Sequence, residues 1–542
     1  MGPEGQPPGG FMGTIDTTAT RARLRLRPTG GAALSLFLGI LLGTVACVAL
    51  ATIGATASPA TPAGASAGRV PTEAVPGLLE LGREFIDAVN VADEAARRTA
   101  VKRIYAQSTL DEVPEADLVA LFGRLRDDLG PLELHHSEVV FRSLHAFVKS
   151  GSGWKDLQFR VETTPPYRIL QLVFLADVTE PVYLPNGGLR SAETIDWIHG
   201  YVEKLMHEDE LGGKILLARG NLTLFQRSIG YLDAKRSIAV TPKTRFNLGS
   251  GNKMFTAVAT MLLVEEGKFG LDDPIGSLLP TFPDANLGKR ITVRRLLSHS
   301  SGLGDYWTDE FERDGRTATT LRDVEPWVYA ELQTNGIHFE PGAEHRYSNS
   351  GFLLLGRIIE EATGQDYFDF VRERIYEPLT MAQTDSYLTD GSQEDLAPPL
   401  IRPTAEDAET SAIWVTGESG LRGTSAGGGF STPPDMLRFV RALVEGKLVR
   451  KETLEEMTSP QPPSSSTADP LGGGYAYGLG FLLERSQTGV LSWGHGGFAP
   501  GVNFELRYFP AEDITFVLFC NQDNGAFDDL KRNVEKLITG DR

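Results

Sequence analysis

The hydrophobic pattern opens with one long apolar segment near the N-terminus. Ala32 to Ile53 is a run of 22 residues that are almost all apolar or small, and no charged residue stands between Arg27 and Arg69. A helix of this length spans the roughly 30 Å of hydrocarbon in a bilayer, whereas the apolar core of a signal peptide has only about 7–15 residues. The pattern predicts that residues 1–68 form an export signal or transmembrane segment followed by a linker.

Two interpretations of this segment remain open. Ala55-Thr56-Ala57 has the small-x-small form of a signal-peptidase site, so the segment is either cleaved or kept as a membrane anchor. Positively charged flanks stay on the cytoplasmic side, and four arginines precede the apolar run: Arg21, Arg23, Arg25 and Arg27. Both interpretations therefore place the rest of the chain on the periplasmic or extracellular face.

Residues 72–180 change from a helical to a strand pattern. Apolar residues first recur at helical spacing, and after Gly130-Pro131 they alternate, with Leu157, Phe159 and Val161 separated by polar residues. A richer apolar run, Ile169 to Leu175, follows. Helices followed by antiparallel strands predict a small accessory α+β domain. It weakly resembles the cone-shaped NTF2-like modules that precede some exported hydrolases.

Residues 192–542 carry strand patterns at both ends and helical patterns between them. Two short apolar runs flank the turn residues Gly220-Asn221, which predicts a β-hairpin. Further strands are predicted near the C-terminus, among them Asn503 to Phe509 and Ile514 to Phe519. We expect one mixed sheet that is formed from the two ends, with the helical middle packed on or beside it.

Composition and charge narrow the classes of protein. The chain has 52 Lys and Arg against 71 Asp and Glu, a net charge of −19. Residues 1–57 carry +2, so the remainder carries −21. Nucleic-acid affinity depends on cationic side chains, which argues against a nucleic-acid partner. The two cysteines cannot form a disulfide scaffold, so stability must come from buried apolar area.

The most informative polar segment is Gly249-Ser250-Gly251-Asn252-Lys253, which opens a helical pattern. Ser250 is placed near the helix N-terminus, and Lys253 lies one turn away on the same face. The positive end of the helix dipole and partial burial both disfavour a charged lysine. Lys253 is therefore a candidate base beside a candidate nucleophile, although an N-cap serine with a surface lysine would show the same spacing.

Two later segments could complete such a site. Tyr347-Ser348-Asn349 precedes a helical pattern, and a Tyr and an Asn two residues apart on a tight loop could point into one cleft. His495-Gly496-Gly497-Phe498 precedes a strand pattern, and its glycines would let a substrate backbone approach closely. No spacing of His, Cys, Asp and Glu indicates a metal site, and we expect no cofactor.

Together these motifs resemble the class C β-lactamase-related serine hydrolases and penicillin-binding proteins. The similarity covers residues 195–535 and includes the segments Leu296 to Leu303, Glu340 to Phe352 and Gly428 to Met436. The resemblance implies a β-lactamase/transpeptidase-like α/β (α+β) fold with a mixed sheet, flanking helices and an all-helical lobe. It also implies a small-molecule or peptide substrate.

The resemblance further implies a role for each residue. Ser250 would be the nucleophile, and Lys253 and Tyr347 would share the base role. Asn349 would orient the substrate, and the His495-x-Gly497 segment would bind it. The N–H groups of Ser250 and Phe498 would form the oxyanion hole. His495 stands where these enzymes carry a lysine. A mostly neutral imidazole attracts a substrate carboxylate more weakly, so we expect esterase or amidase activity rather than efficient β-lactam hydrolysis.

Several alternatives are weighed against this interpretation. Gly423-Thr424-Ser425-Ala426-Gly427 fits the Gly-x-Ser-x-Gly elbow of α/β-hydrolases, but it lacks the preceding strand and the following helix. His299 is interpreted as a structural helix-end residue. The first rival function is a penicillin-recognising binding or sensor protein that acylates but turns over slowly. The second is a non-catalytic interaction protein that works through residues 72–180.

Overall fold

The computed structural model describes residues 75–540 with gaps at 141–142, 163–166, 179–183, 185–188, 190–191, 208–211, 234, 402–414, 417–420, 464–466, 469–473, 487 and 523–524. The predicted export segment and its cleavage site lie outside these residues. Within the described part of the chain, no helix combines the length and the apolar character that a membrane crossing requires.

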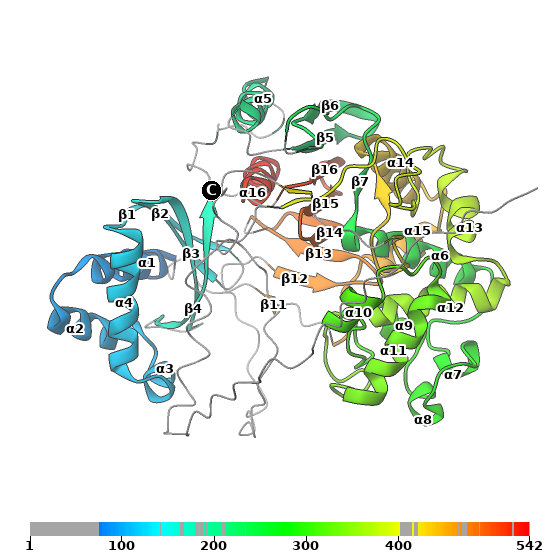
Figure 1. Ribbon diagram of the computed structural model, residues 1–542, viewed down its shortest axis with the longest axis horizontal. Coiled ribbons are helices and arrows are strands. Elements are labelled where there is room, and N and C mark those ends of the chain that lie inside the picture. The colour runs from blue at the N-terminus through cyan, green and yellow to red at the C-terminus, as the bar shows by residue number, and fades with distance from the viewer. Residues whose placement is uncertain are drawn as a thin grey trace, which may run out of the picture. The chain divides into compact units, whose positions relative to one another are not determined.

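The first described region is an α+β unit, as its patterns predict (Figure 1). Its helices precede its strands and are α1 (Val75–Asn90), α2 (Glu94–Ile104), α3 (Gln107–Glu112) and α4 (Glu115–Leu129). The strands form an antiparallel sheet in the order β1 (Glu133–Val140), β2 (Ser143–Ser150), β3 (Gly153–Val161) and β4 (Ile169–Val178). The alternation in β3 buries Leu157 and Phe159 in a hydrophobic core formed by residues of this unit.

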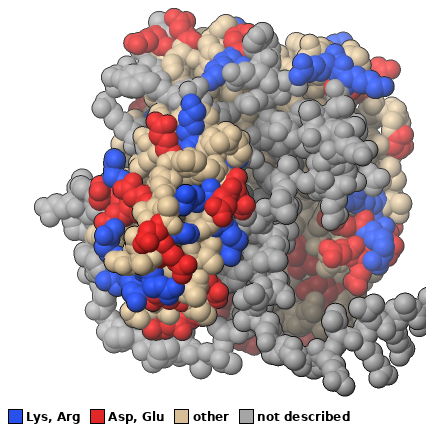
Figure 2. All heavy atoms as spheres, turned by 60° about the vertical axis from the view of Figure 1, so that its left-hand side comes forward, with Lys and Arg blue, Asp and Glu red and all other residues tan. Residues whose placement is uncertain are grey.

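The surface of this unit is of mixed charge. On the face shown in Figure 2, Lys and Arg side chains are interspersed with Asp and Glu. Within this unit, Arg98 pairs with Glu94 and Glu115 at the start of α2 and α4. Such a face lacks the continuous row of cations that would follow a phosphate backbone.

The second region is built on an eight-stranded sheet that joins its two ends. The order is β11 (Thr467–Ala468), β12 (Gly474–Tyr477), β13 (Leu482–Arg485), β14 (Leu491–Ala499), β15 (Val502–Phe509), β16 (Ile514–Cys520), β5 (Gly213–Arg219) and β6 (Leu222–Ile229). The predicted β5–β6 hairpin turns at Gly220, whose φ of 55° suits glycine. As expected, the sheet combines strands from the beginning and the end of this region. All seven ladders run antiparallel, because hairpins join most neighbouring strands.

Helices cover both faces of this sheet (Figure 1). One face packs against α5 (Ala192–His207) and α16 (Ala526–Thr539), and Cys520 is buried there as a small apolar residue. The other face meets α6 (Lys253–Glu265), α14 (Pro433–Val444) and α15 (Lys451–Met457). The remaining helices form the predicted helical lobe: α7 (Ile275–Leu278), α8 (Ala285–Gly288), α9 (Val293–Leu297), α10 (Asp309–Asp314), α11 (Leu321–Asn335), α12 (Asn349–Thr363), α13 (Tyr367–Val371) and the π turn η4 (Arg372–Tyr376).

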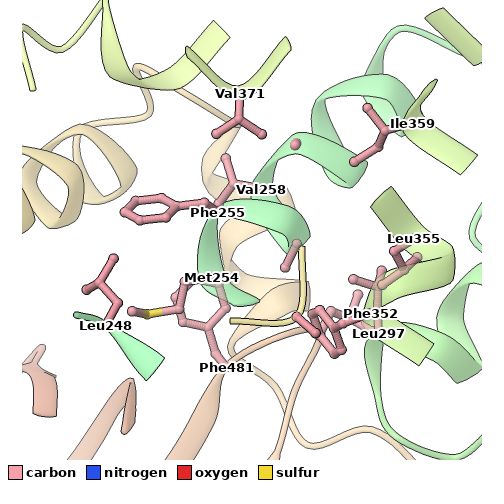
Figure 3. Close-up of a cluster of buried hydrophobic side chains, with 14 of the residues drawn as sticks. Leu248, Met254, Phe255, Val258, Leu297, Phe352, Leu355, Ile359, Val371 and Phe481 are labelled. Atoms are coloured by element: carbon pink, nitrogen blue, oxygen red, sulfur yellow. The ribbon is translucent and has the colours of Figure 1, made fainter. Parts of the chain in front are cut away.

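Helix α6 is the central element, and its position fixes that of the residues that precede it. Figure 3 shows Met254, Phe255 and Val258 of α6 among apolar side chains from the lobe and from the loops beside the sheet. These side chains are at most 2% exposed, so α6 is held from every side. Two short ladders lie beside this core, β7 (Phe246–Asn247) with β10 (Phe430–Ser431), and β8 (Leu400–Ile401) with β9 (Val415–Thr416). The segment that joins β7 to α6 contains Ser250.

Candidate active site

Ser250 lies on a tight turn at the start of the buried helix. Residues Gly249–Asn252 form the 3-10 turn η3, which continues directly into α6. The turn begins at Gly249 with a φ of 48°, a conformation that favours glycine. Ser250 is half-buried, and its Oγ lies 3.1 Å from Lys253 Nζ. The predicted pairing of the two side chains over one helical turn is present.

Lys253 is fully buried and surrounded by acceptors. Its Nζ donates to Asn349 Oδ1 at 2.7 Å and to the carbonyl oxygen of Ala426 at 2.5 Å. Burial lowers the pKa of Lys253 to about 7, and the negative charge of Asp305 partly opposes this shift. A lysine with such a pKa is substantially neutral near pH 7, which is the state a base requires.

Tyr347 and Asn349 converge on the same ammonium group, as the spacing predicts. Ser348 caps α12 by accepting from the Gly351 N–H at 3.2 Å, so Asn349 is the first residue of the helix and Tyr347 lies just before it. The Tyr347 ring centroid lies 4.7 Å from Lys253 Nζ. Burial raises the pKa of the Tyr347 phenol, and its hydrogen bond with Ser250 opposes this only in part. The residue as a whole is 38% exposed, and its raised pKa keeps Tyr347 a neutral phenol beside Ser250.

His299 packs against the loop that carries Tyr347. It follows the end of α9 in a left-handed conformation with a φ of 55°, and its carbonyl oxygen accepts from Arg346 N–H at 2.9 Å. Its Nδ1 accepts from Ser348 N–H at 3.2 Å, and its ring centroid lies 4.3 Å from that of Tyr347. Burial lowers the pKa of His299 well below its usual value. These contacts agree with the structural role that the sequence predicts.

Strand β14 passes directly beside the serine turn. Its ladder with β13 stops at the pair Leu482 and Gly494, so the following residues on that side face η3 instead. A Cβ placed on Gly497 would lie 3.0 Å from Ser250 N, and one on Gly249 would lie 2.9 Å from Phe498 N. The backbones at Ser250 and Phe498 therefore approach closely, as the predicted oxyanion hole needs.

Gly497 gives a direct test of this close approach. A Cβ there would come within 1.9 Å of the Leu248 carbonyl oxygen, so Gly497→Ala must displace β14 from the serine turn. We expect kcat/KM to fall by about 100-fold or more, since a shift of about 1 Å has such effects on catalysis. Gly496→Ala is the matched control, because its Cβ would lie 3.1 Å from Glu505 Oε2 and 3.6 Å from the Phe504 carbonyl oxygen, without the severe backbone overlap found at Gly497. Equal kcat/KM values for the two variants in steady-state assays would contradict this arrangement.

His495, which the sequence predicts to take part in substrate binding, has its ring buried and bonded to Tyr477 of β12. The side chain is 3% exposed. A carbonyl oxygen can only accept, so Nδ1–H donates to the Gly496 carbonyl and Nε2 accepts from the Tyr477 hydroxyl at 2.9 Å. Burial lowers the pKa of His495 to about 3. This imidazole is neutral and holds β14 in place, whereas a lysine here could not be buried in the same way at low cost.

Two residues at the site carry no signal in the sequence motifs. The carbonyl oxygen of Ala426 accepts from Lys253 within the 423–427 loop, whose elbow-like pattern is not a nucleophile elbow. Ser425 is fully buried there. Asp305 Oδ2 accepts from Asn349 Nδ2 at 2.8 Å. Among the described residues, no group of three or more His, Cys, Asp and Glu is arranged to hold a metal ion.

Comparisons with known proteins identify the family and several similar proteins. The model of the β-lactamase family matches residues 198–540. A putative penicillin-binding protein, PbpX of Bacillus subtilis, is 29% identical over 338 residues, which cover 62% of this chain and 78% of that protein. A penicillin-binding protein of Bacillus halodurans has a similar structure, with a TM-score of 0.54 and 26% identity over 63% of this chain and 98% of that one. The D-amino acid amidase of Ochrobactrum anthropi, complexed with L-phenylalanine amide, has a TM-score of 0.52 and 25% identity over 63% and 99%.

Proposed function

The chain belongs to the β-lactamase family, and on this premise we propose that it is a serine hydrolase that cleaves ester or amide bonds through an acyl-enzyme at Ser250. The observation that supports this most strongly is the contact of Ser250 Oγ with a buried lysine whose pKa is lowered to about 7. Serine is a weak nucleophile unless an adjacent base takes its proton.

In the first step, Lys253 is the base. Neutral Lys253 has two N–H bonds, which Asn349 Oδ1 and the Ala426 carbonyl accept, and its lone pair then faces Ser250. Ser250 Oγ bonds to the substrate carbonyl carbon as its proton passes to Lys253. The carbonyl oxygen becomes an anion that the N–H groups of Ser250 and Phe498 stabilise, a contribution usually worth about 3–4 kcal/mol per donor.

In the second step, Tyr347 carries protons as a neutral phenol. Its raised pKa excludes a phenolate as the resting base near pH 7. It can donate to the leaving group as the bond breaks and recover a proton from Lys253. Water then attacks the acyl carbon, its proton returns through the same pair, and Ser250 is released.

The proposed substrate class rests on the burial of His495 and on exposed aromatic residues. The neutral, buried His495 supplies no positive charge for a substrate carboxylate. Phe498 and Trp307 are 50% and 47% exposed although both are large and apolar, and Tyr347 is also exposed. We infer uncharged esters or amides with apolar groups as substrates, among them D-amino-acid amides by analogy with the amidase.

Activity profiling tests this substrate class. We expect the purified protein to hydrolyse p-nitrophenyl esters and D-phenylalanine amide with a higher kcat/KM than a chromogenic cephalosporin, because the β-lactam carboxylate finds no cation at His495. The measurement is steady-state kinetics on all three substrates. Rapid cephalosporin turnover with little ester hydrolysis would contradict the assignment.

A second candidate is a penicillin-recognising protein that acylates and turns over slowly. The names of the Bacillus subtilis and Bacillus halodurans relatives favour it. A fluorescent penicillin that labels Ser250 stoichiometrically and stays bound for hours would support this function, whereas a brief label followed by turnover would support the hydrolase.

We also infer the location and domain plan from the sequence. Residues 1–68 act as the export signal or anchor, residues 72–180 as an accessory domain and residues 192–542 as the hydrolase. The four arginines before Ala32 keep their flank inside, so the hydrolase works outside the cytoplasm. Oligomeric state is left open by these features. Cell fractionation with a tag at the C-terminus measures the location directly.

A further inference from the structure

Asp305 lies in the loop between α9 and α10 and contacts the first residue of α12. Its Oδ2 accepts from both the side-chain amide and the backbone N–H of Asn349, at 2.8 and 3.2 Å. Its Oδ1 accepts from Trp307 N–H at 3.0 Å. Both carboxylate oxygens are thus engaged by groups at the edge of the site, although Asp305 itself does not touch Ser250 in any described contact.

These contacts determine which way the Asn349 amide points. A carboxylate can only accept hydrogen bonds, so the atom of Asn349 that faces Asp305 must be the nitrogen. The atom that faces Lys253 Nζ, at 2.7 Å, must then be the oxygen. With the amide reversed, an N–H group would face the N–H groups of Lys253, and the lysine would lose one of its two acceptors beside Ser250.

We propose that Asp305 is a positioning residue, which fixes the Asn349 amide so that its oxygen holds Lys253 against the serine. The inference rests on the proposed function, because it concerns the base of that reaction. It adds a residue outside the Ser250, Lys253, Tyr347 and Asn349 set, and it gives the carboxylate two separable effects, one through hydrogen bonds and one through charge.

The charge effect depends on the groups that face Lys253 among the described residues. Burial disfavours the ammonium form of Lys253, whereas the negative charge of Asp305 favours it. His299 and His495 are buried imidazoles whose own pKa values are lowered, so both are neutral. Tyr347 is a neutral phenol because burial raises its pKa. Removing the negative charge of Asp305 should therefore lower the pKa of Lys253, because these neighbours are neutral and do not offset the change.

The experiment compares Asp305→Asn with wild type over a pH series of kcat/KM for a p-nitrophenyl ester. The new amide oxygen can still accept from Asn349, while the charge and the acceptor of the Trp307 N–H are lost. We expect the acid limb to move to lower pH by roughly 0.5–1 unit. Glu331→Gln is the matched control. This half-buried carboxylate on α11 is influenced by Asp305, but it is not among the groups that act on Lys253, so its limb should stay in place.

Asp305→Ala separates the hydrogen-bond effect. It frees the Asn349 amide, and we expect kcat/KM to fall at least tenfold across the whole pH range, more than in Asp305→Asn. An unshifted acid limb in Asp305→Asn, or an equal shift in Glu331→Gln, would overturn the proposal while leaving the hydrolase intact. An inactive wild type that no fluorophosphonate labels would instead refute the proposed function. If Asp305→Asn has a much lower melting temperature than the wild type, Asp305→Ser replaces it in the comparison, because serine also keeps an oxygen acceptor.

Discussion

Replacement of Ser250 by alanine should abolish hydrolysis, with kcat reduced by about 10⁴- to 10⁶-fold. The Oγ is the atom that would form the acyl bond, and it is the atom that Lys253 Nζ approaches at 3.1 Å. The loss should be confined to chemistry, because a half-buried serine on a 3-10 turn contributes little packing and the Gly249 and Gly497 backbone contacts remain. Steady-state kinetics measure the loss of hydrolysis, and covalent labelling with a fluorophosphonate probe measures the loss of the nucleophile.

The chain offers a matched control for this experiment. Ser425 lies in the Gly-x-Ser-x-Gly segment and would be the nucleophile if that motif were an α/β-hydrolase elbow. It is fully buried, and its Oγ lies 3.5 Å from the Leu353 carbonyl oxygen. We expect Ser425→Ala to keep its labelling and Ser250→Ala to lose it. Unchanged labelling of Ser250→Ala would remove Ser250 from the reaction, and an unlabelled wild type would favour the non-catalytic interaction protein.

The side chains of the candidate site could be picked out from the sequence because each stands in a short segment, and the order of these segments resembles that of the family. Ser250 and Lys253 are one helical turn apart, so local geometry alone brings them together. Tyr347 and Asn349 flank a capping serine, and this cap makes both side chains face Lys253. The sheet from the two chain ends was predictable for a similar reason, since strand alternation and the Gly220 turn are local signals.

Other features of the site depend on tertiary contacts that no local pattern encodes. Ala426 takes part through its backbone carbonyl, so its side chain carries no signal. Asp305 matters because α12 begins beside it, 44 residues further along the chain. His495 is a predicted substrate-binding residue, and the motif gives no sign that Tyr477, from the next-but-one strand, donates to its Nε2. Burial of this kind is decided by packing rather than by the motif.

Lys253 should prove nearly as important as the serine. Without it, Ser250 keeps its hydroxyl proton, and Lys253→Met should lower kcat/KM by about 10²- to 10⁴-fold. Lys253→Arg should not restore the rate, because a guanidinium remains charged and cannot accept the proton. The same role determines the direction in which kcat/KM of the wild type changes with pH. Since the pKa of Lys253 is about 7 and the neutral form is active, kcat/KM should rise as the pH increases through 7.

Lys214 separates this role from the general behaviour of buried lysines. It is 2% exposed, burial lowers its pKa to about 8, and its Nζ donates to the carbonyl oxygens of Pro242 and Thr244, away from Ser250. We expect Lys214→Met to leave the acid limb near pH 7 in place even if it changes the melting temperature, whereas Lys253→Met should remove that limb together with the activity. Two results would assign the base to another group: an acid limb that persists in Lys253→Met, or a Lys253→Arg variant with the wild-type rate. The base would then have to be Tyr347, whose phenol would lose its proton in spite of the burial that raises its pKa.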